Sequence, residues 1–180
     1  MFRQNFPKTL KPNCLLTRYP VCFLHGLKSI FNFYDYWRGI PEYIGSHGYE
    51  VFELRSRWRG PNDLRVRLFT DQILKILEKA PKVHILAHSL GTLNSLEIAQ
   101  DPRLQGRIAS LTWISPPFRG SPWARLGLLG KWGPFDLFSN TNQTLIEEAA
   151  LSKVQSFAPY YFSKNQKPFP IYSFFSQTTP

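Results

Sequence analysis

A serine at position 89 stands in a pattern that can make its hydroxyl a nucleophile. Ala87 and Gly91 lie two positions to either side of Ser89, after an apolar run at 82–86 and before a helical pattern at 92–100. A serine hydroxyl projects freely from a tight strand-to-helix turn, and small neighbours let the surrounding backbone approach it. An isolated pattern of this kind is common in solvated loops. Its flanking strand and helix patterns favour a strained turn that presents Ser89 to an acyl carbonyl.

A second chemical feature lies upstream, where an apolar run at 19–24 ends in His25, Gly26 and Leu27. Attack on a carbonyl needs two backbone N–H groups that face the developing oxyanion. One comes from the residue after the nucleophile, Leu90, and the other from an earlier loop, for which Leu27 is the candidate. For His25, a structural role that holds its loop by hydrogen bonds is favoured over a direct chemical role.

The positions of the histidines limit the choice of general base. All of them, His25, His47, His84 and His88, precede Ser89. His84 lies in an apolar strand pattern and is expected to be a hydrogen-bonded interior residue. His47 precedes a glycine and is expected to cap a helix C-terminus. His88 adjoins the nucleophile, but neighbouring side chains diverge at a sharp turn, so it would need unusual geometry to act as the base.

The order of apolar runs predicts how these residues are positioned. Runs that read as buried strands alternate with helical patterns, which indicates right-handed crossovers and a parallel sheet. We expect the first strand to lie between the second and the third, so that Leu27 and Ser89 share one carboxyl edge. The expected strands are Val21–Leu24, Val51–Leu54, Val83–Leu86, Ala109–Ile114 and Ile171–Phe175.

Further motifs give these features a family resemblance. The segments at 36–42 (YWRGIPE), 48–51 (GYEV), 60–62 (GPN) and 114–121 (ISPPFRGS), together with the serine turn, resemble bacterial triacylglycerol lipases of the α/β-hydrolase superfamily in order and spacing. The resemblance implies an α/β-hydrolase fold, a mostly parallel sheet with helices on both faces. It also implies a serine carboxylic ester hydrolase that acts on a lipid or small ester. We expect no cofactor, and no metal because the segment that carries the family's structural calcium site is not found in this sequence.

The chain departs from the family pattern in three places. Ala87 replaces the commoner glycine, and Phe118 stands where the family usually has histidine. In this superfamily the triad runs Ser, then Asp or Glu, then His, yet no histidine follows Ser89. The resemblance therefore implies a fold that is incomplete at the C-terminus, with the acid and the histidine supplied by a missing C-terminal segment or a partner chain. The alternative is a catalytically silent truncated lipase fold that binds an apolar ligand or a lipid surface.

Composition favours a single globular domain. The chain has 180 residues, of which 43% are hydrophobic and 16% aromatic. We expect an N-terminal arm at 1–18 and one α/β-hydrolase domain at 19–180, with a cap-like insertion at about 121–170. Large apolar residues alternate with glycines at 123–138, which suits a mobile cover over an acyl pocket or ordinary core packing.

The strong positive charge bears on partners and location. The net charge is +10, which favours an anionic membrane surface or nucleic acid as a partner. Because the sequence has no nucleic-acid-binding motif, no nucleic acid is expected as a partner. Five arginines form a basic cluster that is interpreted as a solvated loop or as a contact for lipid head groups: Arg55, Arg57, Arg59, Arg65 and Arg67. Residues 1–18 lack the apolar core of a signal peptide, which predicts a cytoplasmic protein, or a secreted one if the true start lies upstream.

Overall fold

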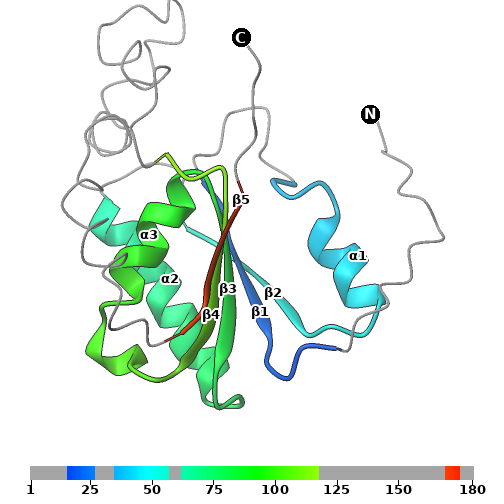
Figure 1. The fold of residues 1–180 in the computed structure, drawn as a ribbon, viewed down its shortest axis with the longest axis horizontal. Coiled ribbons are helices and arrows are strands. Elements are labelled where there is room, and N and C mark those ends of the chain that lie inside the picture. The colour runs from blue at the N-terminus through cyan, green and yellow to red at the C-terminus, as the bar shows by residue number, and fades with distance from the viewer. Residues whose placement is uncertain (1–15, 27–34, 57–61, 118–168, 175–180) are drawn as a thin grey trace, which may run out of the picture.

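The five expected strands pair side by side in one parallel sheet in the computed structural model, which describes residues 16–26, 35–56, 62–117 and 169–174 (Figure 1). Their order is β2-β1-β3-β4-β5, so the expected place of the first strand between the second and the third is confirmed. The strands are β1 Val21–Leu24, β2 Val51–Leu54, β3 Val83–His88, β4 Ile108–Ile114 and β5 Ile171–Phe174.

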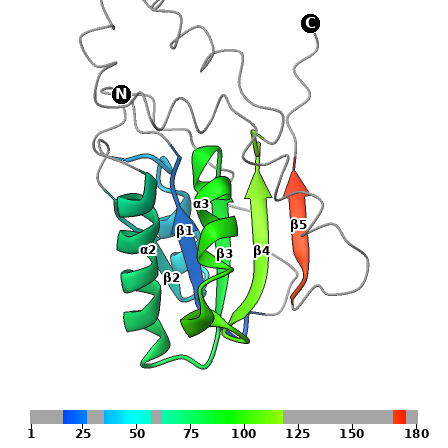
Figure 2. The same ribbon diagram turned by 90° about the vertical axis from the view of Figure 1, so that its left-hand side faces the viewer.

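In the part of the chain that the structure describes, three α-helices cover the two faces of this sheet: α1 Ile40–Ser46, α2 Asn62–Leu77 and α3 Leu90–Ile98. Helices α2 and α3 lie on one face and α1 on the other (Figures 1 and 2). The division follows from the strand order, because the step from β1 to β2 runs across the sheet in the opposite direction to the steps into β3 and β4. Right-handed crossovers then place the connecting helices on opposite faces.

The register of β3 carries the serine turn to the carboxyl edge of the sheet. Leu24, the last residue of β1, pairs with Ala87, while β3 continues to His88 opposite Ile114 of β4. Helix α3 begins at Leu90, directly after Ser89. The strand is thus two residues longer than expected and the helix begins two residues earlier, because pairing with β4 continues up to the turn.

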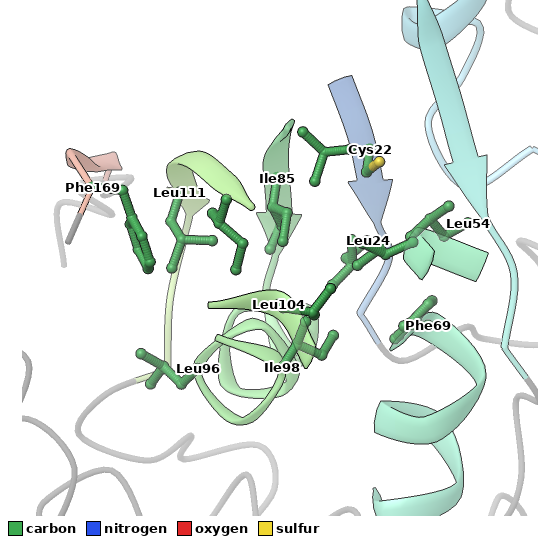
Figure 3. Packing of buried hydrophobic residues seen from close by; sticks show 14 of the residues in the cluster. Cys22, Leu24, Leu54, Phe69, Ile85, Leu96, Ile98, Leu104, Leu111 and Phe169 are labelled. Carbon is green, nitrogen blue, oxygen red and sulfur yellow. The ribbon is translucent and has the colours of Figure 1, made fainter. Parts of the chain in front are cut away.

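The hydrophobic core lies between the sheet and helices α2 and α3 (Figure 3). The first seven residues of α3 are all buried, which is typical of a helix enclosed on every side. Strand β3 alternates buried and half-buried residues, so Val83, Ile85 and Ala87 belong to this core. The buried helix and strand hold the turn between them in a rigid frame.

Several expectations fall outside the described residues. They concern Leu27, Phe118, Phe175, most of the arm at 1–18 and nearly all of the insertion at 121–170. Among the helices that the structure describes, none has the length and apolar character needed to cross a membrane.

Candidate functional site

Ser89 occupies a strained turn between β3 and α3. Its φ of 52° and ψ of −125° fall where residues other than glycine are rare, and the positive φ agrees with the sequence expectation. The Ser89 N–H donates to the Ile114 carbonyl at 3.0 Å, and the Ser89 carbonyl accepts from the Thr92 N–H at 2.9 Å. The backbone on both sides of the side chain is therefore fixed by β4 and by the first turn of α3.

Gly91 lets the first turn of α3 lie against the end of β1. A Cβ atom at this position would stand 2.6 Å from the Leu24 carbonyl oxygen and 2.9 Å from the His25 carbonyl oxygen. Backbone atoms cannot move aside as a flexible side chain can. On the other side of the serine, Ala87 is fully buried in the core. Small residues are thus required at both flanks for the turn to sit this close to β1.

The loop after β1 touches the serine turn at Gly26. A Cβ atom on Gly26 would stand 2.9 Å from Ser89 Cβ, 2.8 Å from the Tyr36 hydroxyl and 3.0 Å from the His88 carbonyl oxygen. Leu90, the other expected donor residue, opens α3, and the first N–H groups of a helix have no acceptor within it. The N–H groups of Leu90 and Gly91, at the positive end of the helix dipole, lie directly after the serine.

His25 is fully buried and holds the loop in place. Its Nδ1 bonds the Gly26 carbonyl oxygen at 2.8 Å, and its Nε2 accepts from the Ser56 N–H at 3.3 Å. Because a backbone N–H can only donate, Nε2 is the acceptor and the ring proton sits on Nδ1. These contacts are those of a structural histidine that ties the end of β1 to the segment after β2.

The other histidines are also bonded away from the Ser89 hydroxyl. His88 Nδ1 pairs with the Tyr36 hydroxyl, and burial lowers the pKa of His88 while it raises that of Tyr36, so the phenol donates to a neutral ring. His84 Nδ1 bonds Ser110 Oγ at 2.7 Å. His47 follows α1 and its Nδ1 bonds the Tyr43 carbonyl oxygen at 2.8 Å, as expected of a residue that caps a helix end. Among the described contacts, every histidine of the sequence therefore bonds a group other than the nucleophile.

Arg65 belongs to this site, contrary to the expectation of a solvated basic cluster. Its side chain is fully buried beneath the His25–Gly26 backbone. The spacing of apolar residues could have revealed the burial of Arg65. This arginine begins a series of residues, four positions apart, that form a buried face of α2: Arg65, Phe69, Ile73 and Leu77. Arg55 and Arg67 are exposed, as the cluster predicted.

Sequence comparisons relate the chain to lipases. No family model matches it. Two curated triacylglycerol lipases, from Pseudarthrobacter phenanthrenivorans and Burkholderia plantarii, are each 38% identical to it over 118 residues, which is 60% of this chain. The matches cover 36% and 32% of those lipases, so the chain spans about a third of the length of these relatives. The resemblance expected from the motifs is confirmed.

Solved structures show the same fold at low sequence identity. A Bacillus licheniformis lipase in its mature form has a TM-score of 0.69 and 17% identity, and the match covers 86% of this chain and 64% of the lipase. A metagenomic carboxyl esterase has a TM-score of 0.63 and 16% identity, over 92% of this chain and 52% of the esterase. A Legionella pneumophila phospholipase has a TM-score of 0.61 and 14% identity, over 89% and 39%. The expected fold class is confirmed.

Proposed function

Because the chain has the α/β-hydrolase fold and resembles bacterial triacylglycerol lipases, we propose that it carries the nucleophile of a serine carboxylic ester hydrolase. The observation that supports this most strongly is the turn at Ser89. A serine with a φ of 52° stands between a buried strand and a buried helix, with Gly26 of a neighbouring loop against its side chain. Strained backbone of this kind persists only where the surroundings enforce it, and it clusters at active sites.

In the proposed reaction, Ser89 Oγ attacks the acyl carbonyl carbon of an ester. The carbonyl oxygen becomes an oxyanion that accepts hydrogen bonds from the backbone N–H groups of Leu27 and Leu90, in the positive field of the α3 N-terminus. The alcohol leaves with a proton, and water then hydrolyses the acyl-serine and restores the hydroxyl. Gly26, Ala87 and Gly91 permit the close approach of the backbone, while His25 and His88 secure the two loops.

The proton of the Ser89 hydroxyl needs an acceptor. Each histidine makes a hydrogen bond to another group, and no histidine follows Ser89 in the sequence. We therefore assign the base and its acid partner to a further polypeptide, either a C-terminal segment or a partner chain that supplies Asp and His.

The names of the curated relatives suggest the substrate class. Both are triacylglycerol lipases, so acyl esters of glycerol are the substrate we propose, with small esters as simpler substitutes. The net charge of +10 supports binding at an anionic lipid surface. Arg65 cannot contact such a surface, because its side chain is buried.

A second candidate function rests on a separate observation. An apolar groove of about 710 Å³ lies on the sheet face that carries α1, lined by side chains of the central strands and of α1 that include Phe23, Tyr43, Ile44, His84 and Leu86. A volume of this size suits a small apolar ligand. The competing proposal is a catalytically silent module that holds such a ligand in this groove.

Ester hydrolysis by the purified chain separates the two proposals. The chain and its Ser89→Ala and Ser46→Ala variants should be compared on esters of short and long acyl chains, alone and with a polypeptide that supplies Asp and His. The hydrolase proposal requires hydrolysis to rise with the added polypeptide in the parent and in Ser46→Ala, whose serine is exposed on α1, and to stay at background in Ser89→Ala. Binding of a fatty acid without hydrolysis under any condition supports the silent module.

A further inference from the structure

A buried guanidinium lies directly beneath the loop that faces the nucleophile. Arg65 on α2 has no exposed surface, and its Nη2 donates to the carbonyl oxygens of His25 at 3.0 Å and Gly26 at 3.2 Å. Burial of a cation is unfavourable unless its donors are satisfied by well-placed acceptors. Here two of those acceptors are consecutive carbonyls of the loop that packs against Ser89 at Gly26.

A polar network fixes the guanidinium in this position. Arg65 Nε donates to Asn94 Oδ1 at 3.3 Å, Asn94 Nδ2 donates to Asn62 Oδ1 at 2.5 Å, and Asn62 Nδ2 donates to Glu97 Oε1 at 2.9 Å. The side chains of Asn62 and Asn94 are themselves buried. Since the network ties α2 to α3, the arginine is held between its own helix and the helix that follows the serine turn.

The direction of these carbonyls determines where the N–H groups of the loop point. In a trans peptide the C=O and the N–H point to opposite sides, and the described chain has no cis peptide. The His25 carbonyl points to Arg65, so the Gly26 N–H points away from it. Burial raises the pKa of the Tyr36 hydroxyl, and a hydrogen bond that the hydroxyl oxygen accepts from the Gly26 backbone opposes this rise; the hydroxyl lies on the Ser89 side of the loop.

From this geometry we infer that Arg65 is a positioning residue for the proposed ester hydrolysis. Its guanidinium holds the consecutive carbonyls of His25 and Gly26 on the side of the loop away from the nucleophile, and this fixes the Gly26 backbone against Ser89 beside the proposed oxyanion site. Arginine suits the task because its planar fork reaches both carbonyls and Asn94 at once, whereas a lysine ammonium is a single point of charge. The inference rests on the proposed function, and it adds a residue that never contacts the substrate.

Arg65→Met and Arg65→Lys test the inference, and Arg107→Met is a matched control. Arg107 also donates to backbone carbonyls, those of Leu77 at 2.7 Å and Pro81 at 2.7 Å, but at the amino end of β3. Two quantities should be measured under conditions in which circular dichroism shows each variant folded. One is the rate at which a fluorophosphonate labels Ser89 with imidazole as an external base, and the other is the hydrogen-exchange rate of the Gly26 amide.

The inference predicts that Arg65→Met lowers the labelling rate by about 10²-fold, as loss of an oxyanion donor does, and accelerates Gly26 exchange. Arg65→Lys should give intermediate values, and it serves as the test variant if Arg65→Met does not fold. Arg107→Met should label at the parent rate. If the parent does not label at all, the proposed function fails, and Gly26 exchange alone then tests Arg65. Unchanged exchange in the Arg65 variants, or an equal change in Arg107→Met, overturns the inference.

Discussion

Gly26 lies so close to Ser89 that a methyl group on Gly26 would stand 2.9 Å from Ser89 Cβ. Two loops from different strands therefore meet at the carboxyl edge of the sheet with no room for a side chain between them. This contact is what turns two sequence patterns, one at 25–27 and one at 87–91, into a single candidate site.

Gly26→Ala should damage the site more than the fold. The added methyl would stand 2.8 Å from the Tyr36 hydroxyl, 2.9 Å from Ser89 Cβ and 3.0 Å from the His88 carbonyl oxygen. The Tyr36 hydroxyl is the tip of a side chain that can move, but the other two atoms belong to the serine turn and can move only if the turn shifts. We expect destabilisation of about 1–3 kcal/mol, typical of overpacking, and a much larger relative loss of Ser89 labelling. Urea unfolding and fluorophosphonate labelling of the same samples measure the two effects. Loss of stability with unchanged labelling would show that the contact does not shape the site.

Gly91→Ala should act chiefly on stability. Its methyl would meet the carbonyl oxygens of Leu24 and His25, which belong to the backbone and cannot swing away. We expect the free energy of unfolding, measured with urea, to fall by about 3 kcal/mol or more. Gly45→Ala is the control, because Gly45 lies within α1 and its methyl would approach only a Val51 side-chain carbon, at 3.3 Å. A Gly91→Ala variant as stable as Gly45→Ala would contradict the packing of α3 against β1.

Stability should fall as the pH drops below about 6.5. Burial lowers the pKa of His84 and of His88 from 6.5, so the folded chain favours their neutral forms and the unfolded chain takes up protons first. The free energy of unfolding is then highest above pH 6.5. It declines as the pH falls from 6.5 toward the lower pKa values that the two histidines have in the folded chain. His88→Gln and His84→Gln should each flatten this dependence when urea unfolding is measured between pH 7.5 and pH 5. A parent chain whose stability does not change over that range would contradict the buried neutral rings.

The sequence predicted those parts of the fold that depend on continuous apolar runs. The bounds of β1 and β2 agree with expectation. β1 is apolar along its whole length, as strands buried in a parallel sheet are, whereas the half-buried β2 at the end of the strand order includes Glu53. The expected end of β3 at Leu86 was too early, since His88 is polar and still pairs with Ile114. The burial of Arg65 could not be read from its residue type, because its cost is offset by carbonyls and amides that only the folded backbone brings together.

The account depends most on the claim that Ser89 is a competent nucleophile that lacks only a base. The most direct measurement is the rate of fluorophosphonate labelling of the purified chain and of Ser89→Ala as imidazole is added to serve as that base. The account predicts slow labelling of the parent that rises with imidazole concentration, and none in the variant. Fast labelling without imidazole that Ser89→Ala abolishes would contradict it by showing a base within this chain, and labelling that never depends on Ser89 would remove the nucleophile itself.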